Sequence, residues 1–229
     1  MKQHRSGERI PALAAGELEG RLRRLLPDVE LDAATVAALH VHYHELRRWS
    51  RSVSLVGPGT CATAIERHYG ESLAALPYLG EGRGRLVDVG SGAGFPGLVL
   101  AIARPGLRVT LLEARERKAA FLEWVAHRTG TACRVLCARL ALPLPAGLPE
   151  EIEFVTLRAV ALERGVWGAL VERLQEEGRI LHWVGPRQDS DRLSGDRSPA
   201  AGLELESETR LPGDPGERRL LRVWRRSVV

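Results

Sequence analysis

The chain has 229 residues, 44% of them hydrophobic, which is enough for one well-filled core but hardly for two independent enzymes. Lys and Arg number 33 against 29 Asp and Glu, and this modest basic excess of +4 suits a phosphate-bearing partner as well as an ordinary solvated surface. No stretch approaches the ~20 apolar residues of a membrane span, and Met1 to Ile10 is too polar for a signal peptide, so we expect a cytoplasmic protein.

The N-terminal third is predicted to be helical. Asp32 is a plausible N-cap, and after it apolar residues recur at spacings of three and four: Val36, Leu39, Tyr43, Leu46 and Trp49. A second helix is expected from about Thr60 to the helix-stopping Pro77, followed by a linker with glycines at 80, 82 and 84. Residues 1–80 are therefore expected to form a helical lobe that belongs to the same domain as residues 81–229.

The rest of the chain alternates short apolar runs with helix-length segments, which predicts βαβ units and a parallel sheet. Strands are expected near 85–89, 108–113, 133–137, 153–158 and 179–184. Residues 202–211 and 218–226 are strand-like runs joined by a turn at 212–216, so they should form an antiparallel hairpin. The polar stretch 187–201 reads as a mobile loop.

The expected fold is therefore α/β: a doubly wound sheet, mostly parallel with a C-terminal antiparallel hairpin, plus an N-terminal helical lobe. Five parallel strands closed by such a hairpin are the layout of the Rossmann-like S-adenosylmethionine methyltransferase domain rather than of a dehydrogenase.

A glycine loop follows the first expected strand, in the segment Arg85-Leu-Val-Asp-Val-Gly-Ser-Gly-Ala-Gly-Phe-Pro-Gly97. Its GxGxxG pattern is a weak signal by itself and leaves a dinucleotide and S-adenosylmethionine as alternatives. Asp88 favours the second, because an acid at the strand end would repel a pyrophosphate, whereas S-adenosylmethionine carries a cationic sulfonium and ammonium. We therefore predict that Asp88, Gly90, Gly92 and Gly94 bind this cofactor.

Glu113 ends the next expected strand, about 20 residues beyond the glycines, where it can accept hydrogen bonds from two ribose hydroxyls. Both cofactors would use such an acid, so Glu113 supports nucleoside binding without choosing between them. The alternative is a surface carboxylate in the charged run Glu-Ala-Arg-Glu-Arg-Lys.

Several methylation chemistries are disfavoured by the sequence. Exocyclic amine methylation usually involves an Asn/Asp-Pro-Pro-aromatic loop after the fourth strand, where this chain has Thr156-Leu-Arg158-Ala. Pyrimidine C5 methylation needs a late Cys nucleophile, and Cys133 and Cys137 lie too early. Guanine N7 has a free lone pair at neutral pH, so its methylation needs positioning and no proton removal, which fits a site without an obvious base.

Residues 86–97 and 111–122, Arg139 and Arg158-Ala-Val-Ala161 resemble the RsmG (GidB) family of bacterial 16S rRNA guanine-N7 methyltransferases. The resemblance covers most of residues 35–185. It implies 16S rRNA or the small ribosomal subunit as partner, and we expect a monomer. It also implies site roles: Gly90 and Phe95 line the cofactor, Leu140 and Ala141 lie beside its adenine, and the catalytic residue Arg158 borders both the cofactor and the target base.

The chain departs from the family pattern at several positions. The family usually has an acid at Ala141, Asn at Ser50 and Ser54, Asp at Glu71, and a Lys after the fifth strand, where Val184-Gly185-Pro186 has none. A small-molecule methyltransferase and a catalytically decayed S-adenosylmethionine-binding protein therefore remain as alternatives. A lid would favour the first of these, and an open basic rim would favour RNA.

Three histidines, His40, His42 and His44, resemble a metal cluster, but no further ligand stands nearby with suitable spacing. We therefore expect them to be solvated helix residues and expect no metal.

Overall fold

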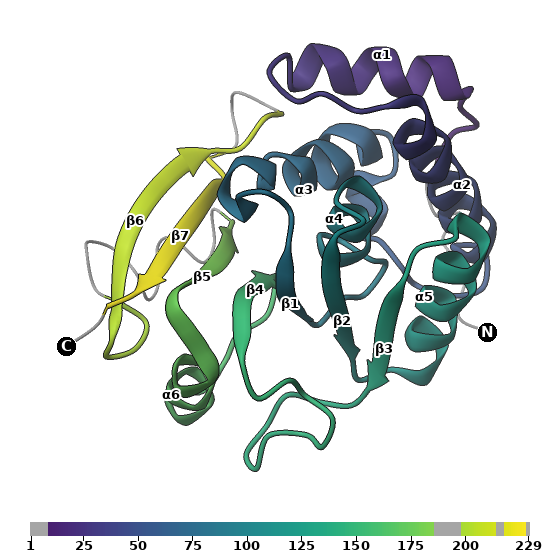
Figure 1. The fold of residues 1–229 in the computed structure, drawn as a ribbon. Coiled ribbons are helices and arrows are strands. Elements are labelled where there is room, and N and C mark those ends of the chain that lie inside the picture. Colours follow the sequence, from purple (N-terminus) through teal and green to yellow (C-terminus); the bar gives the residue numbers. More distant parts are fainter. Residues whose placement is uncertain (1–8, 186–197, 214–217, 228–229) are drawn as a thin grey trace.

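The computed structural model describes residues 9–185, 198–213 and 218–227. Most of the predicted loop at 187–201 and part of the predicted turn at 212–216 lie outside these residues. One seven-stranded sheet has the order β3-β2-β1-β4-β5-β7-β6 (Figure 1). Its strands are β1 (Gly84–Val89), β2 (Leu107–Glu113), β3 (Cys133–Cys137), β4 (Ile152–Arg158), β5 (Leu174–Val184), β6 (Leu203–Arg210) and β7 (Leu220–Arg226).

Strands β1 to β5 are parallel, and β7 runs antiparallel to both β5 and β6. The predicted fold class and the C-terminal hairpin are thus confirmed. The chain moves outward from β1 to β3 and then returns to place β4 on the other side of β1. A crevice at the carboxyl ends of β1 and β4 follows from this reversal, and open α/β sheets bind their ligands there.

Helices cover both faces of the sheet. On one face, α4 (Gly97–Ala103), α5 (Glu116–Thr129) and the N-terminal lobe share a hydrophobic core with alternate strand residues such as Leu86 and Leu111. On the other face, α6 (Arg164–Arg173) packs with Val87, Val155 and their neighbours. The two-residue periodicity of the strands thus divides their side chains between two apolar layers.

The lobe consists of α1 (Ala15–Leu25), α2 (Ala33–Trp49), η1 (Pro58–Thr60), the π-helix η2 (Ile65–Gly70), α3 (Glu71–Leu73) and η3 (Leu76–Leu79). Helix α2 is as predicted, with the Asp32 carboxylate accepting a hydrogen bond of 2.7 Å from the Thr35 N–H.

The predicted helix from Thr60 to Pro77 is wrong in its form. The Thr60 hydroxyl donates to the Gly57 carbonyl at 2.8 Å and so closes a turn instead of capping a long helix. The π-helix begins only at Ile65, and Pro77 lies in the first turn of the short η3 helix, where a missing N–H is tolerated.

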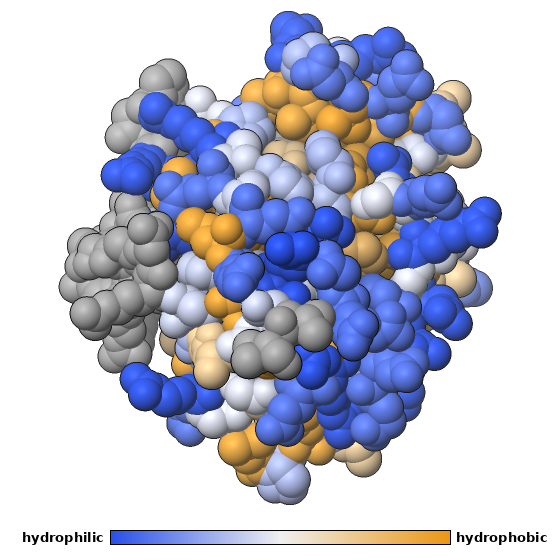
Figure 2. Space-filling view, turned by 60° about the vertical axis from the view of Figure 1, so that its left-hand side comes forward, coloured by the Kyte–Doolittle hydropathy of each residue, from blue (hydrophilic) through white to orange (hydrophobic). Residues whose placement is uncertain are grey.

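Figure 2 shows one face of the molecule, on which hydrophilic residues cover most of the surface and hydrophobic residues form separate areas between them. Within the described ranges, no helix is both long and apolar enough to cross a membrane.

Candidate functional site

A cavity of about 320 Å³ opens at the carboxyl ends of β1, β4 and β5. Its walls come from the loop after β1, the ends of β4 and β5, the lobe and the hairpin. The polar and charged lining includes Ser91, Arg67, His68, Glu71, Arg158 and Arg219, and the apolar lining includes Leu55, Val56, Phe95, Trp183 and Leu211. A largely apolar pocket with a few convergent polar groups is the usual form of a ligand site.

The loop after β1 turns sharply at its glycines. Gly90, Gly92 and Gly94 have φ values of 72°, 54° and 87°, in the left-handed region that side chains disfavour. The N–H groups of Gly90 and Ser91 both donate to the carbonyl of Leu112, at 2.8 and 3.0 Å, and so tie the loop to β2. A Cβ atom on Gly92 would meet no protein atom closer than 3.7 Å, so this position leaves room for a ligand.

Glu113 holds the same loop from β2. One carboxylate oxygen accepts from the Gly92 N–H at 2.8 Å and the other from the Arg115 N–H at 2.9 Å. The residue is 7% exposed and is not part of the cavity lining. Its two oxygens have lone pairs beyond these two bonds, so it can also accept from ribose hydroxyls.

Asp88 is buried beneath the loop. The hydroxyl of Thr156 donates to its carboxylate at 2.7 Å, and a Cβ atom on Gly97 would lie only 2.6 Å from the Asp88 Cγ. Burial raises the pKa of Asp88, and the hydrogen bond from Thr156 opposes that shift. The side chain thus faces the first turn of α4, and here it can act on a cationic ligand through its charge but not as a direct hydrogen-bond partner.

Arg158 brings the end of β4 to the lobe. Its Nη2 donates to Glu71 Oε2 at 2.8 Å and to the carbonyl of Arg67 at 2.5 Å. The other oxygen of Glu71 pairs with Arg219 at 2.6 Å. Burial lowers the pKa of Arg158, and the charge of Glu71 opposes that shift. The Arg158 Nη1 is buried and has no hydrogen-bond partner among the described residues, so the site offers a donor to an anionic or carbonyl group of a ligand.

The predicted site residues therefore fall into three groups. Gly90, Gly92, Phe95 and Arg158 line one cavity. Asp88 and Glu113 contact the loop from outside the cavity lining, and Gly94 belongs to the loop itself but does not line the cavity. Leu140 is partly buried and Ala141 is exposed, in the loop after β3 and outside the cavity lining.

Sequence reasoning gave no individual role to several lining residues, namely Arg67, His68, Glu71, Trp183 and Arg219. Arg219 comes from the hairpin and meets Glu71 of the lobe, which no local pattern predicts.

The three histidines point in different directions. His40 Nε2 bonds to the Leu13 carbonyl, His44 is exposed beside Glu45, and His42 is completely buried. The expectation of solvated histidines is therefore wrong for His42. In the described part of the chain, no cluster of three His, Cys, Asp or Glu side chains could hold a metal ion.

The sheet order, the glycine loop and the acid at the end of β2 define the class as a Rossmann-like methyltransferase. Solved structures with this fold include MtNAS in complex with MTA and tNA, 18% identical, covering 91% of this chain and 81% of that one with a TM-score of 0.57. Another is a putative methyltransferase yhhF from Escherichia coli, 17% identical, covering 69% and 86% with a TM-score of 0.54. At such identities the likeness concerns the fold alone.

The family described as rRNA small subunit methyltransferase G (GidB) matches residues 35–208. Ribosomal RNA small subunit methyltransferase G of Desulfotalea psychrophila is 35% identical over 176 residues, 76% of this chain and 81% of the relative. The protein of the same name from Alkalilimnicola ehrlichii is 35% identical over 221 residues, 96% and 94% of the two chains. The chain belongs to this family, which confirms the resemblance seen in the sequence, and its cofactor is S-adenosylmethionine.

Proposed function

We propose that this chain transfers a methyl group from S-adenosylmethionine to N7 of a guanosine in 16S rRNA. The observation that carries the proposal is the absence of an effective base among the described residues of the cavity. The carboxylate of Glu71 is ion-paired with Arg158 and Arg219, and burial lowers the pKa of His68 to about 3. A site of this kind suits a nucleophile that needs no deprotonation, as guanine N7 does.

The cofactor supplies an electrophilic methyl group on a sulfonium. The chain's own residues supply the geometry: Gly92 leaves space beside the backbone, Glu113 fixes the loop and can accept from the ribose, and Arg158 offers its spare N–H. Because positive charge passes to the purine during transfer, holding the two reactants in line matters more than moving a proton.

Further cofactor contacts are part of the proposal. Glu113 pairs with Cys137 across β2 and β3, so the loop that follows β3 starts beside the expected ribose. Leu140 and Ala141 lie in that loop and are proposed to flank the adenine. Gly94 is proposed to act within the loop by its backbone conformation, and Asp88 is proposed to act from beneath the loop by its charge.

The partner proposed for the site is 16S rRNA, either alone or within the small ribosomal subunit, which would make the protein a cytoplasmic enzyme. Arginines at the cavity suit such a polyanion, because guanidinium forks match phosphate geometry.

The test incubates small ribosomal subunits that lack the modification with the protein and labelled S-adenosylmethionine. Label should appear in 16S rRNA at a guanosine where borohydride and aniline cleave the chain. Label on an exocyclic amine, a ribose or a small molecule would refute the N7 proposal. Cofactor binding without transfer to RNA would instead indicate a protein that has lost its activity.

A further inference from the structure

A buried imidazole joins the lobe to the glycine loop. His42 of α2 is 0% exposed, and its Nε2 lies 2.9 Å from the carbonyl oxygen of Ala93, 51 residues later in the chain. Its Nδ1 lies 2.5 Å from the hydroxyl of Tyr69 in η2. Because a carbonyl only accepts, Nε2 must carry a proton, and in the neutral ring Nδ1 then accepts from the Tyr69 hydroxyl. One tautomer therefore satisfies both bonds.

The imidazole is neutral at physiological pH, because burial lowers the pKa of His42 to about 4. Among the described residues, no backbone N–H donates to the Ala93 carbonyl, so the lobe supplies the hydrogen bond that this buried segment of the loop needs. A buried carbonyl without a partner is costly, and this cost ties the conformation of the loop to the presence of His42.

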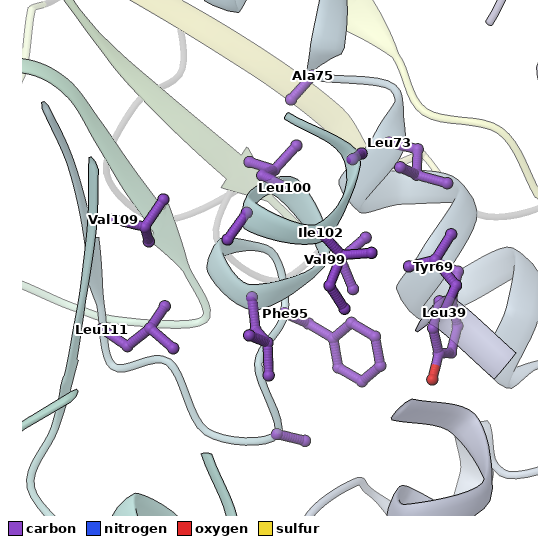
Figure 3. Close-up of a cluster of buried hydrophobic side chains, with 14 of the residues drawn as sticks. Leu39, Tyr69, Leu73, Ala75, Phe95, Val99, Leu100, Ile102, Val109 and Leu111 are labelled. Atoms are coloured by element: carbon purple, nitrogen blue, oxygen red, sulfur yellow. The ribbon is translucent and has the colours of Figure 1, made fainter. Parts of the chain in front are cut away.

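Aromatic packing fixes the next residues of the loop to the same place. The Phe95 ring lies 5.2 Å from the His42 ring and 5.0 Å from the Tyr69 ring, both edge to face. It also stacks on His68 at 4.9 Å. Figure 3 shows the Phe95 ring pointing from the loop toward Tyr69 and Leu39 of the lobe. A Cβ atom on Gly94 would lie 3.2 Å from His42 Nε2, so the loop backbone lies directly against the imidazole.

The two faces of the loop thus make different contacts. One face, at Gly92 and Ala93, lines the cavity, and the other rests on His42. We propose that His42 is a positioning residue for S-adenosylmethionine: its Nε2–H holds the Ala93 carbonyl and thereby fixes the glycine loop in the shape that receives the cofactor. The inference rests on the proposed placement of the cofactor at this loop. It assigns α2 to the cofactor site, because α2 carries His42.

The experiment compares variants that differ in the donor at the Nε2 position. His42→Gln can place an amide N–H near that atom, whereas His42→Leu has similar bulk and no donor. S-adenosylhomocysteine affinity is measured by calorimetry. His42→Leu should weaken binding roughly tenfold, and His42→Gln should recover most of this loss. The variant Tyr69→Phe, which removes only the bond to Nδ1, should weaken binding less than His42→Leu does.

Steady-state kinetics distinguish positioning from a plain structural role. In His42→Leu the KM for S-adenosylmethionine should rise, while kcat at saturating cofactor and the KM for RNA stay close to those of the wild type. A lower unfolding temperature with wild-type affinity for S-adenosylhomocysteine would overturn the inference. If His42→Leu does not fold, His42→Asn replaces it, because its shorter amide cannot reach Ala93; equal affinities of the Asn and Gln variants would then refute the role.

The wild-type protein separates this inference from the proposed function. Wild type that binds S-adenosylhomocysteine but methylates another target contradicts the RNA proposal and leaves the role of His42 to be decided by the variants.

Discussion

Replacing Gly92 by Ala should weaken cofactor binding at a modest cost to folding. The backbone of Gly92 has a φ of 54°, so any side chain there incurs left-handed strain of roughly 1–2 kcal/mol. The new methyl group would meet no protein atom closer than 3.7 Å, so steric repulsion within the protein adds nothing. For a chain of this size such a loss lowers the unfolding temperature by roughly 2–8 °C.

Two other glycines of the segment serve as matched controls. A Cβ atom on Gly94 would lie 2.8 Å from Leu98 Cβ, and one on Gly97 would lie 2.4 Å from Asp88 Cβ. Both contacts are closer than real Cβ atoms tolerate, so Gly94→Ala and Gly97→Ala should destabilise the fold more than Gly92→Ala does. The order of stabilities therefore tests the structure independently of any ligand.

The assay is thermal unfolding with and without S-adenosylhomocysteine. At a ligand concentration 100 times its Kd, the wild type should gain about 2.7 kcal/mol, which corresponds to roughly 5–10 °C. Gly92→Ala should gain less, and the larger Gly92→Val should show no ligand-induced shift. A folded Gly92→Val variant that is stabilised as much as the wild type would refute the placement of the cofactor at this loop.

Two further predictions concern charged groups. Arg158→Ala should lower the rate of methyl transfer by about two orders of magnitude, measured in single-turnover reactions, because it removes a positioning donor. In Arg158→Ala, Glu71 keeps its ion pair with Arg219, so the free energy of unfolding should fall by less than the roughly 3–5 kcal/mol typical of a broken buried pair. If Arg158→Lys transferred the methyl group as fast as the wild type, the fork geometry of the guanidinium would have no role. Stability should also decrease on acidification. His42 and His182 have pKa values of about 4 in the folded protein against 6.5 in the unfolded chain, so the unfolded chain binds more protons between these pH values. Urea unfolding at pH 5 should therefore show a free energy of unfolding about 2 kcal/mol per histidine lower than at pH 7. His42→Gln should reduce this pH dependence, and an unchanged slope would contradict the burial of a neutral ring.

The sequence was sufficient where the determining interactions are local. The alternation of strands and helices, the hairpin, the Asp32 cap and the tight glycine turn each depend on neighbouring residues, and the structure contains them all. Neighbouring residues do not determine which element the Asp88 side chain faces. Its side chain shares the sheet face of Leu86, but which helix covers that face is decided only by the fold.

The Glu71–Arg219 ion pair and the burial of His42 were not predicted from the sequence, for different reasons. The meeting of Glu71 with Arg219 joins the lobe to the hairpin across most of the chain, and no periodicity encodes it. The burial of His42, by contrast, could have been predicted from its spacing in the sequence. It lies three residues after Leu39 and four before Leu46, on the apolar stripe of α2, and this position predicts burial for a histidine as it does for a leucine.

The π-helix η2 makes the number of residues in segment 65–70 important for the geometry of the site. A π-turn contains one residue more than the α-helical turn that it replaces, and η2 supplies His68 to the cavity wall and Tyr69 to the imidazole of His42. Deleting one residue would return the segment to α-helical winding and rotate the residues on one side by about 100° relative to the other. His68 and Tyr69 would then no longer face the cavity and His42 while Ile65 kept its buried place in the core. Insertions and deletions among relatives should therefore avoid residues 65–70, even where their side chains vary.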